Sequence, residues 1–282
     1  MPVLYNLKNL FVGVSCESNW TDTSCAIAYG LSLAQAAGAR LTVQSASQKL
    51  FLPHSRLSDV VAGMVSAENT RLQESAGKIA NDTRAAAELA GISCRTEVPH
   101  MSHVELVTAF LSEARVHDLT IIDAEASPWS PDRAIIEAAV FESGRPVLVV
   151  PQGTETFKAD RILVAWDGSA RAARALNDAL PILKGAALVE VVSVQGEKDL
   201  AGSVLGAELA PHLTSHGVTF VITDLPVVGR DVAQTLRNHA EKTKADMIVM
   251  GAYVHSWFRQ VALGGVTQSL LSTSPIPLYL SY

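Results

Sequence analysis

The sequence predicts an α/β protein made of two tandem copies of one domain, each built on a parallel sheet. Short apolar runs, typical of buried strands, alternate with longer segments of helical periodicity, which is the pattern of βαβ units. A series of five such runs occurs twice along the 282 residues. A polar stretch, residues 151–160, lies between the two series and is interpreted as a linker. We therefore expect one domain at residues 1–150 and a second at 161–282.

The strands are predicted from short runs of mainly apolar residues that end in turn or polar residues. In the first copy they fall at residues 10–15, 40–47, 92–98, 118–123 and 146–150. In the second copy they fall at residues 161–166, 187–194, 218–225, 246–251 and 277–281. Neighbouring parallel strands need crossover connections, so the segments between the runs are predicted as helices with right-handed crossovers.

The starts of several helices are marked by capping residues. Ser102 and Glu105 form a capping-box pattern before a predicted helix at 106–116. Ser130 and Pro131 are predicted as the N-cap and first residue of a later helix. Pro181 falls inside a helical pattern, so that helix is expected to kink or end there. The first copy also has room for a long helix, 62–89, to which the second copy has no counterpart.

The composition excludes several classes of protein. Hydrophobic residues make up 48% and charged residues 18%, which is typical of a folded chain. Because 28 acidic residues exceed 22 basic ones, a broad nucleic-acid-binding surface is not expected. No apolar run approaches the ~20 residues of a membrane span, and the first residues lack a signal-peptide layout. The three cysteines favour free thiols in a reducing compartment, so we expect a cytoplasmic protein.

Glycines mark a candidate phosphate site near the end of the chain. Gly251 closes the apolar run 247–250, and Gly264 and Gly265 precede a helical pattern at 266–271. A helix that begins at a glycine after a buried strand offers free backbone N–H groups and the positive end of its dipole. This stretch is therefore a good place for an anion such as phosphate.

The same stretch resembles the nucleotide-binding motif of the universal stress protein family. That motif has a glycine, two residues, a second glycine, nine residues, a third glycine, and then serine or threonine. Gly251 and Gly264 match the first and third glycines, with the right spacing of thirteen. Val254 occupies the position of the second glycine, and Gly265 occupies the position of the serine or threonine. Thr267 matches a further hydroxyl residue that often follows two positions later in the family.

A second resemblance lies at residues 164–169, Val-Ala-Trp-Asp-Gly-Ser, which are similar to the family's first-strand signature. The resemblance implies doubly wound, Rossmann-like domains with five parallel strands in the order 3-2-1-4-5. It also implies that Asp167 contacts the adenosine part of a nucleotide and that the backbone of Val192, at the end of the second strand, meets adenine. The alternative role for Asp167 is to cap the following helix together with Ser169. The implied binding residues are Asp167, Val192, Met250, Gly251, Val254, Gly264, Gly265, Val266 and Thr267.

The first copy lacks these features at the matching positions. Ser15 and Cys16 stand where the second copy has Asp167 and Gly168, and Asp123 stands opposite Gly251. Carboxylates beside a phosphate site repel the phosphate. We therefore expect the first domain to keep the fold and to have lost the nucleotide site.

The expected function is that of a cytoplasmic stress-response protein whose second domain binds ATP or AMP in a regulatory, non-catalytic role. No metal is expected other than the Mg²⁺ that accompanies a nucleotide, and no phosphate-loop or nucleophile-elbow motif is present. His212 and His216 are four residues apart but lack a third ligand in sequence reach, so they are interpreted as surface residues. One alternative is a regulatory or scaffold module with both sites vestigial, which Val254 favours. A weak ATPase is the second alternative.

The fifth strands, 146–150 and 277–281, predict how the two domains associate. In the order 3-2-1-4-5 the fifth strand is an edge, and an exposed apolar edge pairs readily with another strand. The linker spans at most ~35 Å when extended, which is enough for the two edges to meet within one chain. We therefore expect an internal pseudo-dimer, with a homodimer of the whole chain as a further alternative.

Overall fold

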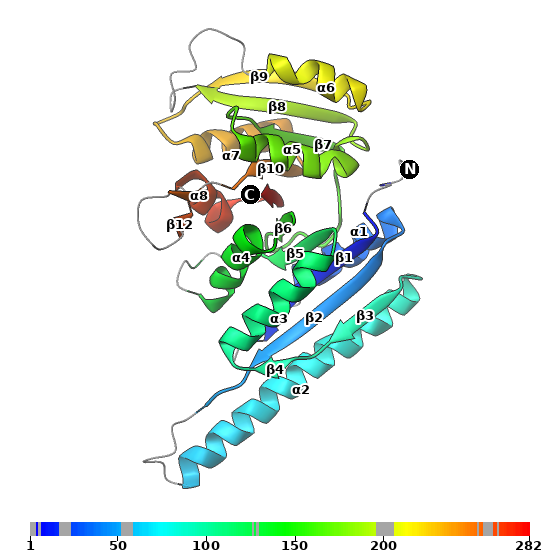
Figure 1. Ribbon diagram of the computed structural model, residues 1–282, viewed down its shortest axis with the longest axis vertical. Coiled ribbons are helices and arrows are strands. Elements are labelled where there is room, and N and C mark those ends of the chain that lie inside the picture. Colours follow the sequence, from blue (N-terminus) through cyan, green and yellow to red (C-terminus); the bar gives the residue numbers. More distant parts are fainter. Residues whose placement is uncertain are drawn as a thin grey trace.

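One continuous sheet of 11 strands runs through the whole molecule (Figure 1). The computed structural model describes residues 4, 7–16, 24–51, 59–125, 127, 130–195, 206–252, 254–255, 262–263 and 265–282. In the first half the strand order is β3 (Cys94–Glu97), β2 (Arg40–Gln48), β1 (Asn9–Cys16), β5 (Leu119–Asp123) and β6 (Val147–Val150). In the second half it is β9 (Phe220–Pro226), β8 (Leu188–Gln195), β7 (Arg161–Ala165), β10 (Met247–Gly251) and β13 (Leu278–Ser281).

All of these neighbouring strands within a half are parallel. The predicted fold class and the order 3-2-1-4-5 are therefore confirmed in both halves. Two small features were not predicted. The two-residue strand β4 (His100–Met101) adds to β2, and β11 (Val254–His255) pairs with β12 (Ala262–Leu263) in a hairpin where a loop was expected.

The helices connect the strands as predicted, with bounds that differ by a few residues. They are α1 (Cys25–Ala37), α2 (Asp59–Leu89), α3 (His103–Val116), α4 (Pro131–Glu142), α5 (Ala170–Leu183), the 3₁₀ turn η1 (Ala207–Leu209), α6 (Ala210–Ser215), α7 (Val232–Thr243) and α8 (Gly265–Thr273). The backbone N–H of Ser102 donates to Glu105 at 3.0 Å, and Ser130 accepts from the Asp132 N–H, so both predicted caps are present. Helix α5 continues past Pro181 to Leu183, so the proline does not end it.

Two apolar cores lie on opposite faces of the sheet, because successive strand residues point to opposite sides. Leu10 and Val12 pack with α1 on one face, where α5 and α6 also contribute. Phe11 points to the other face, which is covered by α3, α4, α7 and α8. No helix in the described part of the chain is long and apolar enough to cross a lipid bilayer.

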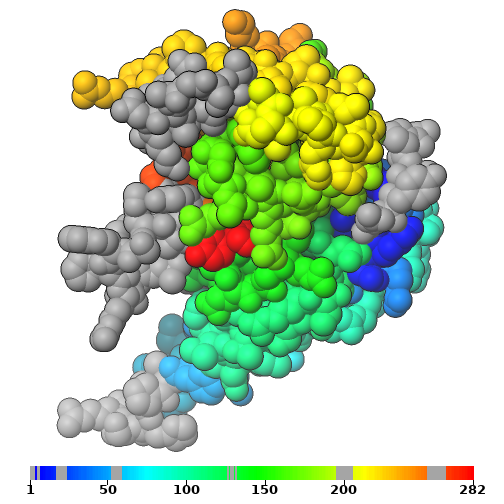
Figure 2. Space-filling model, turned by 45° about the horizontal axis from the view of Figure 1, so that its top comes forward, coloured from blue at the N-terminus to red at the C-terminus, as the bar shows by residue number. Residues whose placement is uncertain are grey.

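The two halves join where β6 and β13 pair in antiparallel fashion, as the fifth-strand prediction required. Leu148 lies opposite Tyr279, and both side chains are fully buried. The hydroxyl of Tyr279 donates to the Asp178 carbonyl at 2.8 Å. In the space-filling view, the end of the chain, in red, lies at this junction (Figure 2). The pairing removes two apolar edges at once and makes one sheet of the two.

The connection between the halves, residues 151–160, is held against α1. The ring of Phe157 meets the ring of Tyr29 edge to face at 5.7 Å, and the Phe157 N–H donates to Ser32 at 3.1 Å. At the end of the connection, the Asp160 N–H donates to the Asp246 carboxylate at 3.0 Å. The connection is irregular and is held at Phe157 and Asp160 although most of its residues are exposed, so its rate of proteolysis reports whether the halves remain docked.

The substitution Leu148→Lys tests the junction. It places an unpaired ammonium group between two buried strands, so we expect the free energy of unfolding to fall by more than about 3 kcal/mol. We also expect faster proteolysis within 151–160. Leu89→Lys is the control, since Leu89 is 92% exposed and should tolerate the charge. Equal stability and equal protection of the two variants, measured by urea unfolding and limited proteolysis, would contradict the role given to this strand pair.

Candidate functional site

The strand register shows which residues of the two halves occupy equivalent places. Gly13 pairs with Gln44 and with Ile122 in the first half. Ala165 pairs with Val192 and with Met250 in the second. It follows that Gln44 takes the place of Val192. By the same register, Ser15 takes the place of Asp167 and Asp123 that of Gly251, so the alignment made from the sequence holds in the structure.

Asp167 lies in the turn between β7 and α5, at the carboxyl edge of the sheet. Its Oδ1 accepts a hydrogen bond from the Ser169 N–H at 2.9 Å, and Gly168 has a φ of 72°, which suits glycine. Ser169 is the N-cap of α5, because its side chain accepts from the Ala172 N–H at 3.2 Å. Asp167 therefore stabilises the turn while its side chain stays exposed.

Gly251 ends β10 and lies directly against the first turn of α5. A Cβ at this position would lie 2.6 Å from the carbonyl carbon of Arg171 and 2.7 Å from the nitrogen of Ala172. The sheet thus brings Gly251 and the Asp167 turn together. The close approach of strand and helix is a sufficient reason for glycine at this position, whether or not a ligand binds. The preceding Met250 is buried in the sheet between Ala165 and Leu280.

The prediction that Val192 marks the end of the second strand is wrong. Strand β8 continues to Gln195, so Val192 lies three residues inside it. Its carbonyl accepts a hydrogen bond from the Trp166 N–H at 2.8 Å, and its side chain is buried. The apolar run itself, predicted as a strand at 187–194, ends within one residue of β8, so the error lies in the role given to Val192 and not in the strand.

The remaining motif residues cluster at the start of α8. Gly265 is its first residue and is exposed, Val266 is half-buried, and Thr267 is fully buried. The hairpin pairs Val254 with Leu263, which shortly precedes α8, so the second position of the motif lies close in space to the helix start although it is distant in sequence. Gly264 and the side chain of Val254 lie outside the described residues.

Asp123 fills, in the first half, the place that Gly251 has in the second. Its carboxylate accepts hydrogen bonds from the Ser24 hydroxyl at 2.5 Å and from the Ala26 N–H at 2.8 Å, at the start of α1. Burial raises the pKa of this carboxyl, and the hydrogen bonds from Ser24, Ala26 and Cys25 lower it in part. An internal carboxylate thus occupies the helix terminus that would otherwise attract a phosphate.

A cavity of about 110 Å³ nevertheless lies beside Asp123, at the carboxyl ends of β1, β2 and β5. Ser15, Gln44 and Glu125 also line it. Sequence reasoning missed this cavity. The available signal was Gln44, a long polar residue at the centre of an otherwise buried strand pattern.

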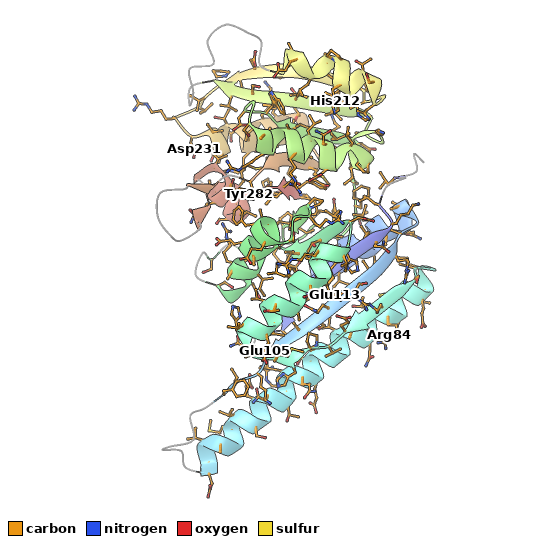
Figure 3. The ribbon with its side chains drawn as sticks, viewed as in Figure 1. Arg84, Glu105, Glu113, His212, Asp231 and Tyr282 are labelled. Atoms are coloured by element: carbon orange, nitrogen blue, oxygen red, sulfur yellow. The ribbon has the colours of Figure 1, made fainter. Side chains whose placement is uncertain are left out.

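Among the described residues, no group of three or more His, Cys, Asp and Glu side chains is arranged to hold a metal ion. The rings of His212 and His216 meet edge to face, with centroids 4.6 Å apart. His212 lies on α6, at the outer part of the second half (Figure 3). The two rings therefore pack on each other.

The structure is that of a tandem α/β protein whose candidate ligand-binding edge lies at the carboxyl ends of doubly wound sheets. Residues 158–281 match the model of the universal stress protein family. This match covers the second half of the chain.

Two solved structures share the fold along the whole chain. A universal stress protein from Archaeoglobus fulgidus is 17% identical, with a TM-score of 0.67, over 99% of this chain and 97% of its own. A protein from Pseudomonas aeruginosa, described as a candidate universal stress protein, is 15% identical, with a TM-score of 0.59, over 99% of this chain and 94% of its own. Comparison with curated proteins gives no match.

A pair of glycine substitutions separates packing from ligand binding. Gly251→Ala forces a methyl group into the backbone of α5, so we expect a loss of about 1–3 kcal/mol in the free energy of unfolding without any ligand. Gly265→Ala meets nothing within 4 Å, so its effect should stay within about 0.5 kcal/mol. Chemical unfolding of the ligand-free variants measures both. A stable Gly251→Ala protein would remove the packing explanation for this glycine.

Proposed function

We propose that the second half binds an adenine nucleotide, ATP or AMP, in a regulatory and non-catalytic role. One observation carries the proposal: the exposed Asp167 turn and Gly251 lie at the same edge, next to the first turn of α5. We further propose that the domains are residues 1–150 and 161–282. We propose a cytoplasmic location as well, which the free thiols of Cys16, Cys25 and Cys94 support.

The chemistry of the site suits the two ends of a nucleotide. The exposed carboxylate of Asp167 accepts hydrogen bonds from ribose hydroxyls. The first turn of α8 has no acidic residue, and it begins at Gly265, which has no side chain to obstruct an approaching phosphate. Any Mg²⁺ at this site would arrive with the nucleotide phosphates.

The alternative function is a regulatory or scaffold module that binds no nucleotide. Two observations favour it. Thr267 is fully buried, so its hydroxyl needs a rearrangement to reach a ligand, and Gly251 is explained by packing alone. In either case the fifth strands are already paired within the chain, so a homodimer would use another surface.

Mass spectrometry of small molecules released from freshly purified full-length protein is the direct test. Release of ATP or AMP in near-equal amount to protein supports the proposal. Calorimetric titration of the ligand-free chain with ATP then gives the affinity, and phosphate release over hours measures any ATPase activity. A chain that carries no nucleotide and binds none at millimolar ATP would favour the scaffold alternative.

Asp167 variants distinguish ligand contact from turn stabilisation. Asp167→Asn keeps an oxygen that can accept from the Ser169 N–H but loses the charge, whereas Asp167→Ala loses both. We expect each to weaken ATP binding by about 1–3 kcal/mol, since a charged acceptor is lost. The exposed Glu241→Ala is the control. If Asp167→Asn binds ATP as tightly as the unsubstituted protein, Asp167 serves only the turn.

The substitution Val254→Gly tests the second position of the motif, where this chain has valine in place of glycine. Glycine lets the backbone approach phosphate without a β-branched side chain in the way, so we expect tighter binding of ATP. AMP, which lacks the outer phosphates, should gain less. An equal gain for both nucleotides, or none, in calorimetric titrations would show that residue 254 does not face the outer phosphates.

A further inference from the structure

The cavity in the first half occupies the place where this fold binds ligands. It lies at the carboxyl ends of β1, β2 and β5, which is the point where the strand order reverses. The register makes it the counterpart of the candidate nucleotide site in the second half. Its lining differs in charge and polarity, so the two sites do not suit the same ligand.

Carboxylates dominate the polar part of this cavity. Asp123, Glu125 and Asp132 all line it, and among the described residues of the lining there is no lysine, arginine or histidine. One carboxylate oxygen of Glu125 accepts from the Ser127 N–H at 2.7 Å. Asp123 already accepts hydrogen bonds from Ser24 and Ala26 at the start of α1. It therefore contributes mainly its negative charge to the cavity. The described lining therefore carries acidic groups, of which Glu125 is balanced in part by the neighbouring Arg133.

Gln44 supplies an independent observation that points to a ligand. The residue is only 2% exposed, and its side-chain nitrogen donates to Glu97 at a long distance of 3.5 Å. Within the described part of the chain, its side-chain oxygen accepts no hydrogen bond although the residue lines the cavity. This oxygen is not among the fully buried atoms that lack a partner, so a donor in the cavity can reach it.

Arg133 is a buried cation that follows the cavity-lining Asp132 on α4. Its side chain is almost fully buried on α4, where Nη1 donates to the Glu125 carbonyl at 3.1 Å and Nε lies 3.5 Å from Glu137. It does not line the cavity. Its charge is balanced by Glu137 and Glu125, which also act on its pKa against the lowering by burial.

We propose that the first half binds a small organic amine in this cavity, held by the carboxylates of Glu125 and Asp132 and by the Gln44 oxygen. The cavity also has an apolar wall of Leu106, Phe110 and Ile135, which suits a short methylene chain. Its volume of about 110 Å³ is well below the roughly 300–1,000 Å³ of sites for drug-sized ligands, which suits a small ligand.

Putrescine is the probe for this site, and 1,4-butanediol is its neutral counterpart. Calorimetric titration of the full-length protein with putrescine should show one site, and the diol should not bind. Glu125→Gln and Asp132→Asn should each weaken putrescine binding at least tenfold, and Gln44→Leu should weaken it as well. Glu88→Gln, an exposed acid on α2, should leave the affinity unchanged. Thermal unfolding of each variant establishes that it is folded.

Three outcomes would overturn the proposal. The first is no binding of putrescine to the unsubstituted protein, which would leave a cavity filled by water alone. The second is equal weakening by Glu88→Gln and Glu125→Gln, which would indicate pairing with surface charge only. The third is displacement of putrescine by inorganic phosphate in folded protein, which would assign the site to anions. None of these depends on whether the second half binds a nucleotide.

Discussion

The antiparallel pairing of β6 with β13 is the contact on which the rest of the molecule depends. Each half alone would expose a short apolar edge strand, and the pairing buries both edges in one continuous sheet. Within each half, one aspartate at the start of the fourth strand holds the start of the first strand beside it. Asp118 accepts from the N–H groups that begin β1, and Asp246 does the same for β7. These contacts set the first strand against the fourth, so the carboxyl ends meet at one edge.

The repeated frame explains why much of the fold could be predicted from the sequence. Strand positions follow from apolar runs and the repeat, which are short-range patterns. The strand order follows from the family resemblance, and the junction follows from the edge position that this order gives the fifth strands. The predicted strand 187–194 agrees with β8 to within one residue at each end, but Val192, expected at its end from the resemblance, lies inside it. The hairpin of Val254 and Leu263 was missed because tertiary context, rather than local periodicity, pairs such short strands.

The candidate sites were predicted less completely, because they depend on packing between distant segments. The ring of Phe110 lies so close to Gly13 that a Cβ there would be 2.2 Å from it, and this contact shapes the wall of the first cavity. No spacing in the sequence predicts the contact between Phe110 and Gly13. By contrast, the exchange of Gly251 for Asp123 was visible, since it is a change of charge at one position of a repeat.

That exchange gives the two halves of one frame different candidate sites. At the end of β10, glycine lets the backbone of α5 approach closely. At the end of β5, a carboxylate instead takes up the N–H groups of α1 and lines the neighbouring cavity with an acidic group. The two sites share the junction, where Tyr282 contacts Arg171 of α5 and the ring of Phe141 on α4 (Figure 3). Helix α4 carries both Asp132, which lines the first cavity, and Phe141, which contacts Tyr282 at the junction. The position of this one helix therefore affects both places.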